Sequence, residues 1–238
     1  MIKRMLTSAI VAGGVAGLLA ALLHFAVIQD KILLAERYET GDLVHFAGAA
    51  VSANDDRAMA GHTIDLPAPG PDLKRDALTV AFAALIHVAY ALILSAGFAV
   101  AAQVGRRITA REGVLWGIAG FVAFQMAPAM GLAPALPGTL AADLATRQLW
   151  WWGTVAATAA GLALIGFGRG MGMAALAIVL IAAPHVIGAP KVEGFFGVVP
   201  PELAADFGTS VLGVGLVVWA VMGALAGWLW SATDPEAG

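Results

Sequence analysis

Three histidines of this sequence lie inside long apolar runs, where an ionisable side chain is costly to bury. They are His24, His87 and His185. Ionisable residues in membrane spans are rare and mark functional sites by default. Neutral imidazole is a good ligand for cobalt, nickel, copper and zinc ions, so the histidines are candidate metal ligands. Each histidine would also serve as an interhelical hydrogen-bonding residue, and this structural alternative stays open.

The three histidines have compatible depths in the predicted helices. With a rise of about 1.5 Å per residue, His24 lies roughly 28 Å and His185 roughly 20 Å from the inner ends of their helices. By the same measure, His87 lies roughly 14 Å below the outer end of its helix. Gln125 and Met126 have a depth similar to that of His185. We therefore expect these side chains to line one cavity that opens to the outer side.

An acidic patch is predicted above that cavity. Helical spacing places Glu36 and Glu39 on one helix face, with Asp42 and His45 close behind in the sequence. Carboxylates complete imidazole sites for transition metals. An ordinary solvated helix face is the alternative interpretation of this patch. The predicted metal-binding residues are His24, Glu36, Glu39, His87 and His185.

The composition restricts the protein class. Of 238 residues, 60% are hydrophobic and only 12% are charged, with a mean hydropathy of +0.85. Soluble domains carry about 25% charged residues, so a water-solvated surface is excluded. A net charge of −3 gives no indication of nucleic-acid binding, and without cysteine there are no thiolate ligands. No HExxH, GxSxG or phosphate-loop motif is present, so we expect neither an enzyme nor a permanently bound cofactor.

Long apolar runs predict an all-α, polytopic membrane helix bundle. A helix needs about 20 apolar residues to cross the bilayer core. The predicted bundle is a single membrane domain, 1–238, with about six transmembrane helices near 5–28, 78–103, 113–130, 148–167, 171–188 and 208–230. The first run is too long for a signal peptide, and we expect it to be retained.

The basic residues predict how the chain is oriented. Lysine and arginine favour the cytoplasmic side of a membrane. They occur before the first span and in two short connections, at Lys3, Arg4, Arg106, Arg107, Arg111 and Arg169. Both termini are therefore expected in the cytoplasm, and the acidic segment 29–77 is expected to form an extracytoplasmic loop.

Two stretches indicate an internal duplication of the third and fourth helices in the fifth and sixth. Ala127-Pro128 and Ala183-Pro184 are each followed by another proline six residues later and then by a Leu-Ala-Ala-Asp box. Paired proline interruptions in repeated spans are a pointer to a transport site, although a packed kink is an equal alternative. We expect Asp143 and Asp206 in those boxes to open the returning helices.

Pairs of glycines four residues apart recur in three predicted spans. These pairs are Gly13 with Gly17, Gly113 with Gly117, and Gly223 with Gly227. Such spacing is typical of close helix packing, within the bundle or between copies of the chain in a homo-oligomer. We assign these residues no chemistry.

Several motifs resemble the CbtA family of predicted cobalt transporter subunits over nearly the whole chain. They are LLAERYE (33–39), APAMGLAPALPG (127–138), RQLWW (147–151), PHVIGAP (184–190) and VPPELAADF (199–207). The resemblance implies a multi-helix protein of the bacterial inner membrane and a small single-span partner, CbtB, with histidine near its end. It points to Glu36, Glu39 and His185. In the second copy of the repeat, His185 follows Pro184, whereas no histidine follows Pro128 in the first copy.

The function expected is that of a membrane transporter subunit for uptake of a divalent transition-metal ion, with cobalt as the first candidate and nickel next. Two alternatives remain: a non-transporting scaffold for a partner helix, and a transporter of an organic solute. Without a nucleotide motif, energy is expected from an ion gradient, the membrane potential or a partner.

Overall fold

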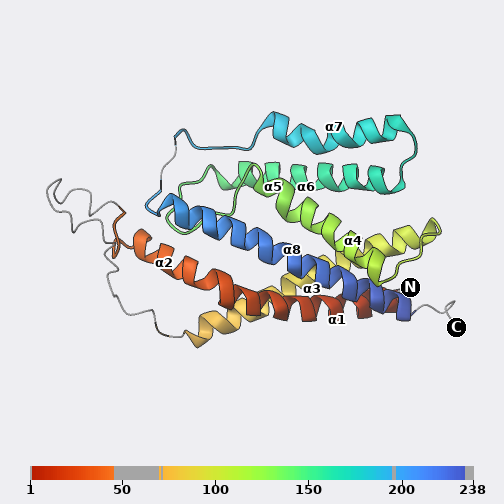
Figure 1. Ribbon diagram of the computed structural model, residues 1–238, viewed down its shortest axis with the longest axis horizontal. Helices are drawn as coiled ribbons and strands as arrows, with labels where there is room; N and C mark the ends of the chain where they lie inside the picture. The colour runs from red at the N-terminus through yellow and green to blue at the C-terminus, as the bar shows by residue number, and fades with distance from the viewer. Residues whose placement is uncertain (1, 46–69, 71, 195–196, 234–238) are drawn as a thin grey trace.

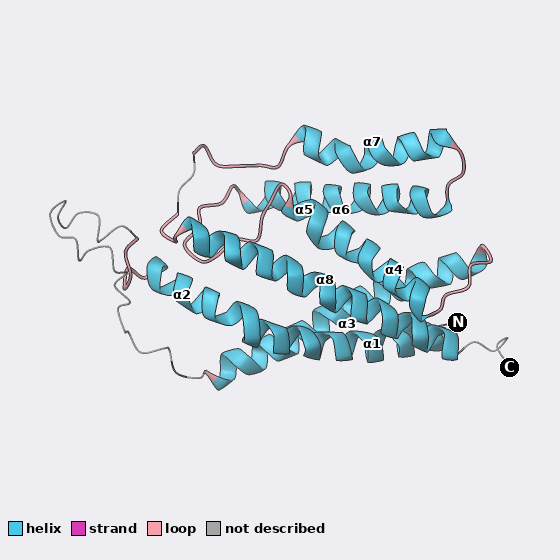
Figure 2. Ribbon diagram, in the orientation of Figure 1, coloured by secondary structure: helices cyan, strands magenta, loops and turns pink. Residues whose placement is uncertain are grey.

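The structure of the protein is a computed structural model that describes residues 2–45, 70, 72–194 and 197–233. This part of the chain is helical and contains no strand (Figures 1 and 2). In chain order its elements are α1 (Ile2–Leu23), η1 (His24–Ile28), α2 (Gln29–Glu39), α3 (Leu73–Gln103), α4 (Ala110–Phe121), η3 (Val122–Met126), α5 (Ala127–Ala129), α6 (Leu144–Phe167), α7 (Met171–Ile187) and α8 (Pro201–Ala232), where η marks a π-helical turn.

The helices have the length and hydropathy of membrane spans. Four runs are long and apolar enough to cross a bilayer: Ile2–Glu39, Leu73–Gln103, Leu144–Phe167 and Pro201–Ala232. The shorter α7 is also apolar, and α4, η3 and α5 form the remaining run. The predicted all-α membrane bundle is confirmed. The number of spans and their limits in a membrane stay a prediction, and the middle of the predicted 29–77 loop lies outside the described residues.

Two helices begin earlier than the apolar runs suggest. α3 begins at Leu73, because the Asp72 carboxylate accepts hydrogen bonds from the amides of Lys74 and Arg75 at 3.0 and 3.1 Å. α8 begins at Pro201, whose fixed φ suits the first helical position. Asp206 therefore lies inside α8, and the expectation that it opens this helix is wrong. Asp143 does cap α6, accepting from the Thr146 amide at 3.0 Å.

α1 and α3 pack with their backbones in contact. A methyl group on Gly13 or Gly17 would collide with the α3 backbone at Val88 or Ala84. In lipid, where little hydrophobic force joins helices, small residues allow the close approach that gives van der Waals attraction. The first predicted glycine pair is thus a packing surface within the chain.

α4 and α8 cross in the same way, but with glycines on both sides. A methyl group on Gly113 would collide with the carbonyl of Gly223, and one on Gly117 would collide with the carbonyl of Trp219. Gly227 in turn lies against Thr109 and Gly113. The remaining two glycine pairs therefore pack on each other, and they fix α8 against α4.

The core lies where α1, α3, α4 and α8 meet. Its largest fully buried side chains include Trp219, Trp230, Phe98 and Met222. At the end that carries both chain termini, the Arg4 guanidinium lies 4.3 Å from the centroid of the Trp230 ring and donates to the Trp230 carbonyl at 2.7 Å. This contact joins the first and last helices.

α6 and α7 form a hairpin on one side of this core (Figure 1). The Trp150 indole donates to the Pro184 carbonyl at 3.1 Å, and Gly161 lies against Ala177 and Ile181. In the described part of the chain, α6 is the only helix on which α7 packs. Most of the α7 surface is therefore left for lipid or another protein.

In the predicted duplication, the first helix of each copy packs on the second helix of the other copy. The first helix of one copy, α4, packs on α8 of the other, and α7 of the second copy packs on α6 of the first. An antiparallel bridge between Thr139 and Gly197 joins the two connecting loops. This pairing is the one expected if a two-fold axis relates the copies. The duplication itself stays a prediction.

We predict that filling the α4–α8 crossing destabilises the protein. Gly117→Val should lower the free energy of unfolding by about 1–3 kcal/mol or more, since the added atoms meet backbone rather than a flexible side chain. Gly213→Ala on the same helix is the control, because a methyl group there meets no atom within 4 Å. Unfolding of both variants in micelles by heat or denaturant measures the difference. Equal stability would contradict the packing described.

Candidate functional site

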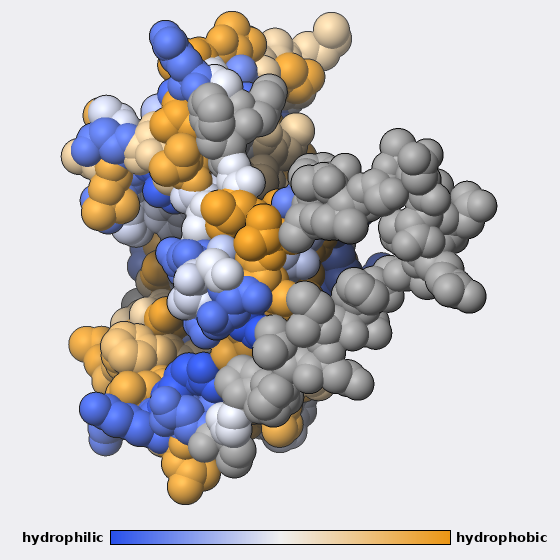
Figure 3. Space-filling view, turned by 90° about the vertical axis from the view of Figure 1, so that its left-hand side faces the viewer, coloured by the Kyte–Doolittle hydropathy of each residue, from blue (hydrophilic) through white to orange (hydrophobic). Residues whose placement is uncertain are grey.

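The candidate site lies at the end of the molecule opposite the chain termini, where polar groups are concentrated. It is built from α2, the start of α8 and the connecting residues 130–143, 188–194 and 197–200 (Figure 1). A small apolar cluster of Ile28, Ala35, Leu136, Val199 and Phe207 holds these segments together. Figure 3 shows this end, where hydrophilic groups alternate with apolar ones. We call it the loop end.

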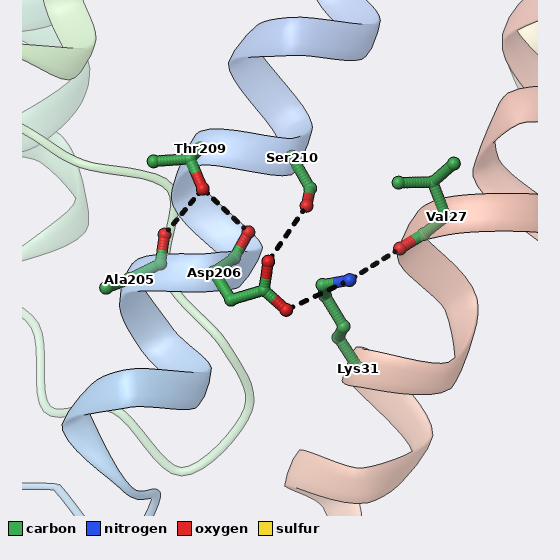
Figure 4. A network of polar contacts seen from close by, with 6 residues as sticks. All are labelled: Val27, Lys31, Ala205, Asp206, Thr209 and Ser210. Carbon is green, nitrogen blue, oxygen red and sulfur yellow. Dashed lines mark hydrogen bonds and ion pairs between the residues drawn. The ribbon is translucent and has the colours of Figure 1, made fainter.

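An ion pair joins α2 to α8 at the loop end (Figure 4). Lys31 Nζ lies 3.1 Å from the Asp206 carboxylate and donates to the Val27 carbonyl at 3.0 Å. The Ser210 hydroxyl donates to the other carboxylate oxygen at 3.4 Å. Asp206 is 60% exposed, so this pair adds little stability, but it fixes the side chain that the sequence had suggested as a cap.

His24 begins the π-helical turn η1, and Asp76 of α3 is the charged group whose field acts on it. Within that turn the Gln29 amide bonds to the His24 carbonyl, five residues back. The Oδ1 of Asp76 is buried without a hydrogen bond in the described chain, and Arg75 Nε lies 3.9 Å from it as an ion-pair partner. Sequence reasoning missed Asp76, because it placed this residue in the loop. The capping aspartate at position 72 was the signal for the earlier start of α3.

His87 lies deeper in the bundle than His24. Its Nδ1 is 2.7 Å from the Ala83 carbonyl, and its ring contacts Tyr90 edge to face. The His87 backbone lies against Gly13, eleven residues before His24 on the first helix. That separation is about 16 Å along the helix axis. The structure therefore does not bring His87 and His24 together.

His185 lies on the opposite side of the bundle. Its ring contacts the Trp150 ring edge to face, at a centroid distance of 6.2 Å. Its helix, α7, makes no contact with α1 or α3 in the described part of the chain. The expectation that the three histidines line one cavity is therefore not met by this arrangement.

The predicted acidic patch lies on α2 at the loop end. Glu36 is half-buried, and Glu39 is exposed and lies against Gly138 of the first connecting loop. Among the residues that the structure describes, no group of three or more His, Asp or Glu side chains is placed to hold a metal ion. The five predicted ligands are thus distributed along the bundle, and their role as ligands stays a prediction.

Gln125 is a partly buried polar side chain that faces α8. It lies in the second π-helical turn, η3, and its side-chain oxygen packs against the Gly215 backbone of α8. That oxygen is buried without a hydrogen-bond partner. Pro128, three residues on, has no N–H to donate to the Phe124 carbonyl, which is consistent with the change from α-helical to π-helical hydrogen bonding in this turn.

Both π-helical turns contact α8. η1 packs there through the loop-end cluster, which includes Val211 and Val214, and η3 packs through Gln125 on Gly215. We call this strip of α8, 211–215, the α8 seam. π-helical turns are rare and frequently mark functional sites. The seam therefore combines a buried amide oxygen with two irregular helix turns.

Comparison with known proteins identifies the family of the chain. The model of a family described as "Probable cobalt transporter subunit (CbtA)" matches residues 2–231. The chain belongs to the CbtA family. No curated protein and no solved structure matches it. Membership in CbtA makes the chain a subunit of a membrane transporter, and a subunit has a partner protein.

We predict that Gln125 contributes to function rather than to the stability of the fold. Replacing it by Met, a side chain of similar length, removes a buried oxygen that has no partner. The unpaired oxygen costs about 1–3 kcal/mol, so Gln125→Met should unfold at the same temperature as wild type or higher. It should also lower metal uptake.

Gln103→Met is the control for this prediction, since Gln103 is exposed at the end of α3. Thermal unfolding and uptake are measured on the same preparations. If Gln125→Met is destabilised and transports normally, the amide has a structural role.

Proposed function

We propose that this protein is the membrane subunit that takes up a divalent transition-metal ion, with cobalt as the cargo and nickel as its closest competitor. The observation that carries the proposal is the family match over residues 2–231. The chemistry of the described residues is compatible with it. Imidazole, carboxylate and carbonyl oxygen are ligands for such ions, and all three occur between the loop end and the α8 seam.

The proposed entry is at the loop end. Glu36 and Glu39 attract the cation, and His24 with Asp76 offers an imidazole nitrogen and a buried carboxylate oxygen. From there the ion follows the α8 seam to Gln125. At each proposed site along this route the chain supplies few ligands, so the ion is bound weakly. Weak binding suits transport, because a conducting site must release its ion.

The partner is proposed to complete the coordination. The resemblance to CbtA implies a small single-span subunit with histidine near its end, CbtB. α7 is its proposed docking helix, because α7 packs on α6 alone within the described chain and carries His185. His87, deeper in the bundle, is proposed as a relay ligand through the ring nitrogen that Ala83 does not use.

The proposed location is the bacterial inner membrane with both termini in the cytoplasm. The termini lie at the same end of the bundle as the α3–α4 and α6–α7 connections (Figure 1). These segments carry Lys3, Arg4, Arg106, Arg107, Arg111 and Arg169. A positive end of this kind favours the cytoplasmic side.

Uptake of radioactive cobalt tests the proposal. Cells that lack their own cobalt importers express the chain together with its partner. His24→Ala, and the double variant His87→Ala with His185→Ala, should each lower uptake about tenfold or more, as loss of groups around a metal does. Excess nickel should compete with cobalt, whereas magnesium should not.

Gln103→Ala, matched for abundance in the membrane, is the control. Wild-type uptake in all the histidine variants would sink the ligand assignments. Absence of cobalt uptake by wild type with its partner would sink the proposed function itself.

A further inference from the structure

A cavity of about 640 Å³ lies between α3, α4 and α6, near the end that carries the chain termini. Its walls are mainly apolar and include Leu94, Trp116, Ala123, Leu162 and Ala163. None of the predicted metal ligands lines it. The volume is in the range that holds one small ligand.

The cavity exists because α6 touches the core at two separated places. Near the loop end α6 packs on η3 and α5, where the Phe124 and Trp151 rings lie 6.1 Å apart. At the other end Arg106 donates to the Gly166 carbonyl at 2.7 Å, and its guanidinium lies 5.6 Å from the Phe167 ring centroid. In the described chain α6 does not pack on α3, and the cavity lies between these two helices beside α4.

The mouth of the cavity is positively charged. Arg106 and Arg107 line it together with Glu112. Arg107 makes no hydrogen bond or ion pair with the residues that the structure describes. The Thr109 hydroxyl donates to the Glu112 carboxylate, which lowers the pKa of Glu112 and keeps it ionised within the α4 capping box. Glu112 offsets one of the two guanidinium charges, so the mouth keeps an excess positive charge.

The cavity therefore combines apolar walls with one guanidinium group, that of Arg107, which has no partner among the described residues, and this combination suits an anionic amphiphile. We propose that the cavity binds an anionic phospholipid, with an acyl chain between α3, α4 and α6 and the headgroup phosphate on Arg107. Basic pockets between membrane helices bind anionic headgroups in this way. A transmembrane helix of 20 residues, about 30 Å long and 10 Å wide, occupies roughly 2,400 Å³ and does not fit.

The bound lipid would act as a wedge between the core and the α6–α7 hairpin. Arg106 holds the end of α6 at Gly166. The lipid would fill the cavity that remains beside this contact, between α6 and the core. The inference does not depend on which ion the protein carries. The proposed lipid site and the proposed ion route along the α8 seam lie in different parts of the bundle.

The test uses full-length protein purified in mild detergent, and native mass spectrometry counts bound lipid. Phosphatidylglycerol is titrated against phosphatidylcholine with the same acyl chains. Wild type should retain phosphatidylglycerol at least tenfold better. Arg107→Gln should lose that preference, whereas Arg169→Gln should keep it, since Arg169 lies at the same end but not on the cavity.

A second variant tests the chamber separately. Ala163→Leu narrows the cavity without removing charge, and it should lower retention of both lipids, with thermal unfolding confirming that it folds. Equal retention of the two lipids by wild type would overturn the headgroup assignment. Unchanged preference in Arg107→Gln or unchanged retention in Ala163→Leu would overturn the site.

Discussion

The glycine crossing between α4 and α8 is the contact on which the rest of the structure depends. Gly113 and Gly117 meet Gly223 and Gly227 backbone to backbone. In a bilayer the surrounding lipid is as apolar as the side chains, so close packing has to supply the attraction. This crossing places α8 in the centre, where α1 packs on its other side. Both π-helical turns then face the same strip of α8.

Two packing units follow from that crossing. The core of α1, α3, α4 and α8 is held by small residues and buried aromatic rings, and the α6–α7 hairpin is attached to it at its two ends. The polar chemistry divides in the same way. His24, Asp76 and Gln125 surround the core, and His185 belongs to the hairpin. A metal path and a partner surface are thus proposed on different units.

The sequence predicted the all-helical fold and the glycine packing faces, whereas the limits of the spans in a membrane stay a prediction. Apolar runs located the helices, and the spacing of Gly113 and Gly117 identified a packing face, because both signals are local. The neighbours of each helix are not local. Depth placed His87 and His185 at compatible levels, but depth says nothing of which side of the bundle a helix occupies. Asp76 and Asp206 were misplaced because the caps at Asp72 and Pro200–Pro201 lie outside the apolar runs.

The central claim is that the α8 seam forms the route of the ion. Because the chain has no cysteine, single cysteines report on one position each. Val214→Cys lies on the seam, and Val217→Cys lies on the exposed face of α8. The rate of labelling by a water-soluble thiol reagent, with and without cobalt, is the decisive measurement. The account predicts that Cys at 214 is labelled and that cobalt slows the reaction, with no cobalt effect at 217. No labelling at 214, or labelling that cobalt leaves unchanged, would contradict it.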